Sequence, residues 1–257
     1  MKLNLVYFSP TNTTKKIISA IGKVFFEKTL SSTKIIDLTS LAARVREYNF
    51  SEEDVVIFGA PVYGGRIPQL LVPVLKKFSG NGARAVIVSV YGNRDYDDAL
   101  LETYNIFSEQ GFLVCAAAAF IGEHSYSEKV GGGRPDSEDI LAAQTFAHIA
   151  ATKVVGGFPI QKKIKGSYPY KELSKALSSA RKAPKINENC VHCGKCITVC
   201  PVCNIAADLK DTGKCIGCAA CVKNCPQKAR SFGEDIQAIK EKLENNFVMR
   251  KTPEFFI

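Results

Sequence analysis

The chain has 257 residues, of which 46% are hydrophobic and 23% charged, and its formal net charge is +9. This length fits one ordinary domain and a smaller one, and the apolar fraction is that of a globular protein rather than a fibrous or disordered one. The longest apolar run, residues 112–122, is too short to span a bilayer, and Met1-Lys2 leads directly into an apolar segment, so we expect a cytoplasmic protein without an export signal.

The first 155 residues alternate strand patterns with helix patterns. Apolar runs of strand length are predicted at 2–8, 33–38, 54–60, 84–92 and 112–122. Helices are predicted at 13–28, near 39–47, at 67–78 despite Pro73, at 97–110 before Gly111, and at 137–154 with Ser137 as N-cap. Five strand–helix repeats predict an α/β domain with a parallel sheet covered on both faces. Ligands of such sheets bind beyond the carboxyl ends of the strands.

Three loops follow strands at that edge. The first, FSPTNTTK (8–15), opens a helix whose N-terminus could bind phosphate. The second, APVYGGRIP (60–68), has a tyrosine for stacking and two glycines that let a peptide flip. The third, VYGNRDYDDA (90–99), offers two more tyrosines and an amide, while Asp97 could equally cap a helix. Each loop alone also fits an ordinary cap or turn; their convergence points to a bound nucleotide with a flat ring.

At these loops the chain resembles the flavodoxin family, because SPTNTT (9–14) matches its phosphate loop and PVYGGRIP (61–68) its second flavin loop. The resemblance covers about residues 1–155 and implies a doubly wound five-stranded parallel sheet in the order 2-1-3-4-5 that binds FMN noncovalently. The residues expected to contact FMN are Ser9, Thr11, Asn12, Thr13, Thr14, Pro61, Val62, Tyr63, Gly64, Gly65, Tyr91, Gly92, Asn93, Arg94, Tyr96 and Asp97.

Two arginines depart from the family pattern. Arg66 and Arg94 flank the expected ring, where flavodoxins are often acidic. A nearby cation favours an anionic reduced flavin, so we expect a higher reduced-state potential than a flavodoxin has, and a lower one in Arg94→Ala. The later loop 122–139, with His124 and Arg134, is interpreted as a solvated loop, with contact to a partner or substrate as the alternative.

The excess positive charge lies in the rear of the chain. Residues 1–155 carry 16 basic and 16 acidic residues, whereas residues 156–257 carry 18 and 9. We divide this part into a basic linker at 156–187, a cysteine-rich domain at 188–235, and a C-terminal helix and tail at 236–257, with the helix pattern itself running over 234–247.

Nine of the ten cysteines lie between Cys190 and Cys225. Disulfides are improbable without export, so the thiols are interpreted as metal ligands. The pattern C-x2-C-x2-C-x3-C-P occurs at 190–201 and recurs 25 residues later at 215–226. Three cysteines at this spacing can wrap one [4Fe–4S] cube, and the fourth thiolate comes from elsewhere.

Over about 45 residues this region resembles the bacterial-type two-cluster ferredoxins, in which the fourth cysteine of each run ligates the other cluster. The resemblance implies two [4Fe–4S] clusters, one held by Cys190, Cys193, Cys196 and Cys225, the other by Cys215, Cys218, Cys221 and Cys200. Zinc, the alternative, suits two such runs badly. Cys203 has no place in the repeat, and Cys115 is expected to be a small buried hydrophobe.

As a whole the chain resembles the flavodoxin–ferredoxin fusion proteins of anaerobic prokaryotes. That resemblance implies an electron carrier between FMN, two clusters and an external redox protein. A flavin-dependent oxidoreductase that reduces a small substrate is the alternative, and a redox-sensing regulator is a third. Two clusters and one flavin phosphate, at about −2 each, would leave a net charge of about +3, so nucleic acid is not expected as a partner.

Overall fold

The structure is a computed structural model that describes residues 1–29, 32–173 and 183–257. Residues 174–182, part of the predicted basic linker, lie outside this description.

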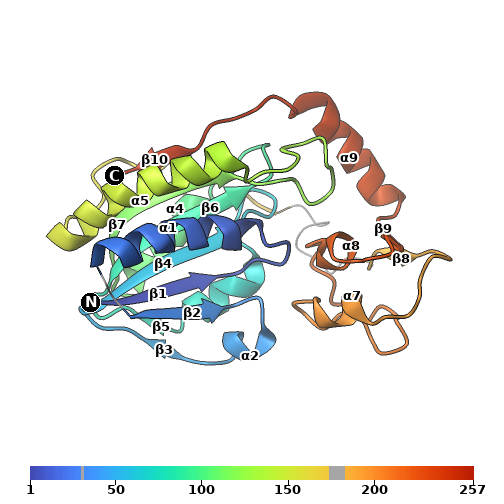
Figure 1. Cartoon of the computed structure of the whole chain (residues 1–257), viewed down its shortest axis with the longest axis horizontal. Helices are drawn as coiled ribbons and strands as arrows, with labels where there is room; N and C mark the ends of the chain where they lie inside the picture. Colours follow the sequence, from blue (N-terminus) through green and yellow to red (C-terminus); the bar gives the residue numbers. More distant parts are fainter. Residues whose placement is uncertain (30–31, 174–182) are drawn as a thin grey trace.

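A six-stranded sheet forms the centre of the larger part (Figure 1). Its order is β10-β7-β6-β4-β1-β2, and all neighbours pair in parallel except β10, which is antiparallel to β7. The strands are β1 (Lys2–Tyr7), β2 (Thr33–Asp37), β4 (Asp54–Pro61), β6 (Arg84–Tyr91), β7 (Leu113–Ile121) and β10 (Glu254–Phe256). Numbering only the five parallel strands gives 2-1-3-4-5, so the predicted flavodoxin-like fold is confirmed.

Helices cover both faces of the sheet. On one face, α1 (Thr13–Thr29) and α5 (Ser137–Gly156) enclose a core that includes Ile17, Phe120 and Phe146. On the other face lie α3 (Val72–Leu75) and α4 (Ala99–Glu109), over a core that includes Phe58 and Phe107. The short elements are α2 (Leu41–Arg44), η1 (Gln69–Leu71), and the paired strands β3 (Tyr48–Asn49) and β5 (Phe78–Ser79).

Three local predictions need correction. The helix predicted at 67–78 is a 3₁₀ turn followed by one short helix with Pro73 in its first turn, because proline has no N–H to continue a ladder. The N-cap of α5 is Asp136, not Ser137; its side chain accepts the N–H groups of Glu138 and Asp139 in a capping box. The last residues, expected as a tail, supply β10.

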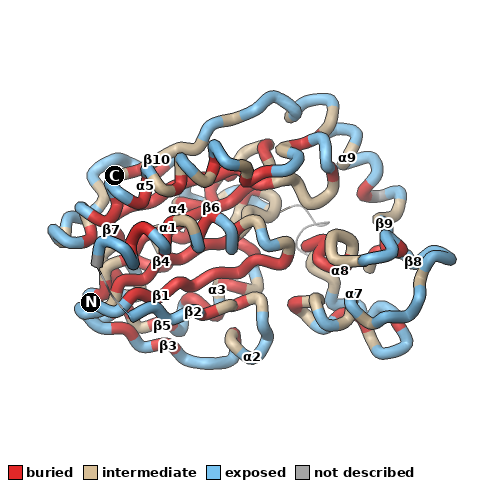
Figure 2. The backbone as a smooth tube through the Cα atoms, viewed as in Figure 1, coloured by how far each residue is buried: buried red, intermediate tan, exposed pale blue. Residues whose placement is uncertain are grey.

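The cysteine-rich part lies beyond the carboxyl ends of the parallel strands (Figure 1). It contains α7 (Lys195–Thr198), α8 (Ala220–Lys223), the antiparallel pair β8 (Lys185–Ile186) and β9 (Arg230–Ser231), and α9 (Glu234–Asn246). Its apolar core is small, centred on Ile205, Leu209 and Cys221, and Figure 2 shows far less buried backbone here than in the sheet. So small a core is typical of domains that a bound metal group stabilises.

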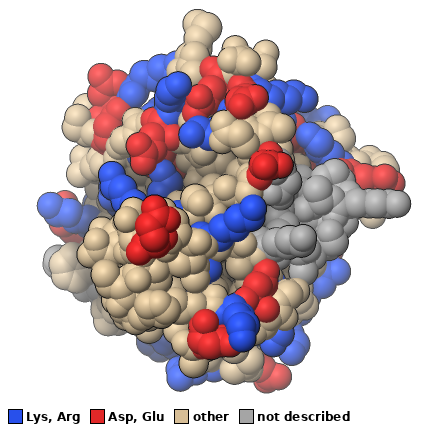
Figure 3. All heavy atoms as spheres, turned by 90° about the vertical axis from the view of Figure 1, so that its right-hand side faces the viewer, with Lys and Arg blue, Asp and Glu red and all other residues tan. Residues whose placement is uncertain are grey.

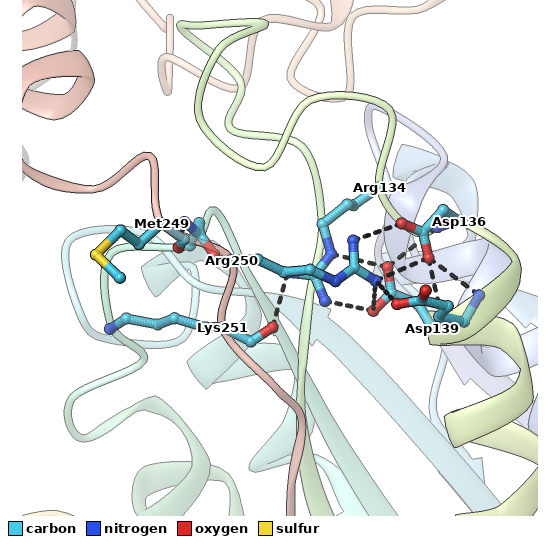
Figure 4. A network of polar contacts seen from close by, with 8 residues as sticks. Arg134, Asp136, Asp139, Met249, Arg250 and Lys251 are labelled. Atoms are coloured by element: carbon cyan, nitrogen blue, oxygen red, sulfur yellow. Dashed lines mark hydrogen bonds and ion pairs between the residues drawn. The ribbon is translucent and has the colours of Figure 1, made fainter.

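After α9 the chain returns to the sheet. We call residues 247–257 the C-terminal strap. The side chain of Asn93 donates to the carbonyls of Phe247 (2.6 Å) and Met249 (2.8 Å). Arg134, which forms a buried ion pair with Asp139, also donates to the carbonyl of Lys251 at 2.9 Å (Figure 4). The strap therefore ties the end of α9 to two loops at the carboxyl edge of the sheet.

Candidate functional site

A cavity of about 310 Å³ lies at the carboxyl edge of the sheet. Eight of the predicted flavin contacts line it: Thr11, Thr13, Pro61, Val62, Tyr63, Gly64, Tyr91 and Gly92. They come from all three predicted loops, which the fold brings together because the loops follow the adjacent strands β1, β4 and β6.

The first loop is built around the N-terminus of α1. The Ser9 hydroxyl accepts the N–H of Lys15 at 3.0 Å, which leaves the earlier amides of the helix facing the loop. Asn12 has a positive φ of 66°, which turns the chain into the helix. Thr14 is fully buried, and its hydroxyl oxygen has no hydrogen-bond partner among the described residues. A buried hydroxyl at a helix N-terminus suits an anionic ligand such as phosphate.

The second loop turns at Gly64 and Gly65, whose φ values are 65° and 90°. A Cβ on Gly65 would overlap the carboxylate of Asp97, so glycine is needed where the second and third loops meet. Tyr63 is partly buried, and its surroundings raise the pKa of its hydroxyl well above the usual value, chiefly by desolvation, so it stays neutral.

The third loop divides between the cavity and the strap. Tyr91 and Gly92 line the cavity. Asn93 binds strap carbonyls, and the buried Tyr96 donates to Glu254 of the strap at 2.9 Å. These two side chains thus bond to the strap and do not line the cavity.

The two arginines expected to flank the ring are already paired. Arg66 makes a two-pronged contact with Glu102, at 2.7 and 2.6 Å. Arg94 pairs with Asp97, which also accepts from Lys171 at 3.1 Å. These carboxylates offset the positive charge of both arginines, and the expected rise in reduced-state potential stays a prediction.

Residues outside the predicted set complete the cavity. They are Gly122 to Tyr126 after β7, Ile67 to Leu70, Val90, Leu173, and Lys214 to Gly217 of the cysteine-rich part. The loop after β7 could have been found, since it ends a strand at the same edge, but it carries no phosphate or flavin motif. The loop 122–139 is solvated only in part: Lys129 and Gly132 are exposed, as expected, whereas Arg134 is buried in its ion pair with Asp139.

The eight predicted cluster ligands lie in two groups. Cys200, Cys215, Cys218 and Cys221 line one cavity, and Cys190, Cys193, Cys196 and Cys225 line another. This is the division that the ferredoxin resemblance implies. Within the described residues, no three His, Cys, Asp or Glu side chains are grouped as for a single ion. The thiols instead surround a space, as the corners of an iron–sulfur cube require.

Other thiols lie apart from these groups. Cys203 is exposed and belongs to neither cavity wall, and Cys115 is fully buried in β7. Burial raises the pKa of Cys115 to about 11, and that of Cys218 and Cys221 to about 12 in the metal-free chain. A metal ion must therefore displace protons from the last two when it binds.

The cavity at the sheet edge shares a wall with the cavity lined by Cys200, Cys215, Cys218 and Cys221, which we call the inner cysteine cavity. Cys215, Ile216 and Gly217 line both. The wall is held in place by the Tyr126 hydroxyl, which donates to the carbonyl of Gly217 at 2.9 Å, while Ile216 packs against the core of the sheet domain. The cavity at the sheet edge therefore adjoins the inner cysteine group, whereas none of its lining residues belongs to the outer group of Cys190, Cys193, Cys196 and Cys225.

Two further polar contacts join the loop after β7 to the cysteine-rich part. Lys223 of α8 forms an ion pair with Glu123 after β7, and both side chains are about three-quarters buried. Ser127 donates to Glu244 of α9 at 2.6 Å.

Comparisons with known proteins identify the two cysteine runs. Two segments match models described as a 4Fe-4S binding domain, residues 187–203 and 209–231. No curated protein sequence matches the chain. None of the helices within 1–29, 32–173 and 183–257 is long and apolar enough to cross a membrane.

Among solved structures the chain is similar to flavodoxins. An archaeal flavodoxin is 17% identical over 60% of this chain and 99% of its own, with a TM-score of 0.43. A Streptococcus pneumoniae flavodoxin is 16% identical over 60% and 99%, also with a TM-score of 0.43. A Fusobacterium nucleatum flavodoxin bound to flavin mononucleotide is 17% identical over 61% and 98%, with a TM-score of 0.42. The chain thus joins a flavodoxin-like sheet, assigned from its strand order, to 4Fe–4S binding segments.

Proposed function

We propose that this chain is an electron-transfer protein that binds FMN in the cavity at the sheet edge. Electrons pass between FMN, an inner [4Fe–4S] cluster held by Cys200, Cys215, Cys218 and Cys221, an outer one held by Cys190, Cys193, Cys196 and Cys225, and an external redox protein. The observation that carries the proposal is the wall of Cys215, Ile216 and Gly217, which belongs to both the FMN cavity and the inner cluster cavity.

The cavity fits FMN at both ends. At one end, Thr11 and Thr13 line the cavity at the start of α1, where a phosphate would be held, and the neighbouring Thr14 has a buried hydroxyl without a partner among the described residues. At the other, Tyr63 and Tyr91 offer aromatic faces to a flat ring. FMN supplies one- and two-electron chemistry when bound, and the protein supplies position and electrostatics.

The surrounding residues hold the two parts in one arrangement. The Tyr126–Gly217 hydrogen bond and the Lys223–Glu123 ion pair connect the loop after β7 to the cysteine-rich part. Because donor and acceptor then share one chain at fixed separation, transfer between them is intramolecular.

The external partner meets the chain at the outer cluster. Cys193 and its neighbours Val191 and His192 are exposed, whereas Cys218 and Cys221 of the inner group are buried. On the face shown in Figure 3, basic and acidic side chains are interspersed rather than gathered by sign. This surface suits a redox protein better than a polyanion such as nucleic acid.

Anaerobic stopped-flow spectroscopy tests the proposal. The protein is purified without oxygen, its FMN, iron and sulfide are quantified, and a sub-stoichiometric reductant is added. We expect flavin and cluster absorbance to equilibrate at a rate that does not change with protein concentration. A rate proportional to protein concentration, or a preparation with clusters but no flavin, would contradict it.

A further inference from the structure

His124 stands out among the cavity residues that the sequence motifs do not explain. It follows β7, lines the FMN cavity, and packs with the Cδ2 edge of its ring against Gly92 of the third loop. Its ring meets that of Tyr126 edge to face, with 5.4 Å between centroids. These contacts hold the imidazole on two sides.

Hydrogen bonding defines the tautomer of this ring. Nδ1 of His124 accepts the backbone N–H of Tyr126 at 3.1 Å. An acceptor nitrogen carries no proton, so the single proton of the neutral ring is on Nε2. Among the hydrogen bonds of the described residues, this one at Nδ1 is the only one that the His124 side chain makes. The cavity is thus lined by a donor that still lacks an acceptor.

We propose that His124 is a ligand-positioning residue whose Nε2–H donates a hydrogen bond to an acceptor atom of the bound nucleotide. This inference rests on the proposed binding of FMN and adds a contact that no flavodoxin motif of this chain predicts. The backbone N–H of Tyr126 fixes the donor, and Tyr126 also holds the wall at Gly217. The same loop therefore positions both the nucleotide and the inner cluster segment.

The electrostatic surroundings keep the ring uncharged. Burial, together with the positive charges of Arg94 and Lys223, lowers the pKa of His124 to about 4. The donated hydrogen bond is accordingly that of a neutral imidazole throughout the range from pH 6 to 8. The other titratable groups on the cavity wall are Glu123, Lys214, Cys215, Tyr63, Tyr91 and Tyr126.

The test compares FMN dissociation constants, measured by flavin fluorescence on the cluster-loaded protein. His124→Leu removes the donor and should weaken FMN binding roughly 3- to 10-fold, the effect of one neutral hydrogen bond. His124→Gln places an amide N–H near the position of Nε2 and should restore most of the affinity. His148→Leu, at an exposed position on α5, is the matched control and should bind as the wild type does. Iron content and melting temperature establish that each variant is folded.

The outcomes separate two failures. If His124→Leu binds FMN as tightly as the wild type, or if Gln and Leu weaken binding equally, the donor role is overturned while the electron-transfer proposal stands. The ratio of the Leu and wild-type constants should also stay constant from pH 6 to 8. A ratio that rises as the pH falls would mean a cationic imidazole and would overturn the neutral donor. A wild-type protein that binds no FMN overturns both proposals.

Discussion

Thr14 carries a fully buried hydroxyl oxygen without a partner at the start of α1. An unsatisfied buried hydroxyl costs about 1–3 kcal/mol, so a protein retains one where a ligand completes it. Thr14→Val keeps the shape and removes the hydroxyl. We expect the FMN-free protein to melt at an equal or higher temperature, and FMN affinity to fall about tenfold. Calorimetry and flavin fluorescence measure the two effects.

Thr103 is the matched control for that change. It is also buried in a helix, but its hydroxyl donates to the carbonyl of Ala99 at 2.8 Å. Thr103→Val should lower stability by about 1 kcal/mol and leave FMN affinity unchanged. If Thr14→Val destabilises the FMN-free protein as Thr103→Val does, Thr14 has a structural partner and the phosphate role is wrong.

The cysteines permit an equally direct comparison. Cys218 lies in the inner group and Cys203 on neither cavity wall. Replacing Cys218 with serine should remove about half of the iron and sulfide, since one of two cubes loses a ligand. Cys203→Ser should retain all of both. Elemental analysis of anaerobic preparations decides between these outcomes; equal losses in the two variants would refute the assigned division of ligands.

Residues were predictable where their partners are close in sequence or lie in a fixed spacing. The spacing of the cysteine runs brings three thiols of each run together, and the ferredoxin resemblance supplied the exchange of the fourth cysteine that the cavities show. Asn93 and Tyr96 were assigned to the flavin because they lie in the correct loop. Their partners, Phe247 and Glu254, are more than 150 residues away. No local pattern could indicate such contacts.

The same distinction applies to whole elements. The strands β1, β4, β6 and β7 were predicted because they are buried on both faces and are therefore continuous apolar runs, whereas the exposed edge strand β2 was predicted from its short apolar run alone. The short strand β10 could not be, because three residues give no periodicity and its position depends on the edge of β7. It covers that edge, which would otherwise offer unpaired backbone groups to other chains.

The aromatic anchor of β10 can be tested at this scale. Phe255 packs against Phe120 and Phe146, with centroids 5.7 and 5.1 Å away. Phe255→Ala should lower the free energy of unfolding by about 2–3 kcal/mol, because it leaves a cavity between the strand and α5. Met249→Ala, in the same strap but 84% exposed, should change it by less than about 0.5 kcal/mol. Denaturant unfolding measures both, and equal effects would mean that β10 is not anchored through Phe255.

For the whole molecule, the wall that the FMN cavity shares with the inner cysteine cavity has a kinetic consequence under the proposed function. The FMN cavity is walled by Cys215 to Gly217 and by Tyr126, and the exposed thiol Cys193 belongs to the outer group. In the proposed relay a protein donor reaches the flavin through the outer and then the inner cluster. The sequence could not indicate this order, since the ligand division places neither cluster relative to the sheet.

Cys193→Ser should remove the outer cluster while the inner one and the FMN cavity remain. Reduction of the flavin by a reduced two-cluster ferredoxin should then slow at least about tenfold, because the intramolecular route begins at the missing cluster. Reduction by dithionite, a small molecule that needs no docking surface, should keep its wild-type rate. Stopped-flow flavin absorbance follows both reactions, with Cys203→Ser as the control that retains both clusters. If the ferredoxin reduces the Cys193→Ser flavin at the wild-type rate, electrons enter at the flavin itself and the serial relay is wrong.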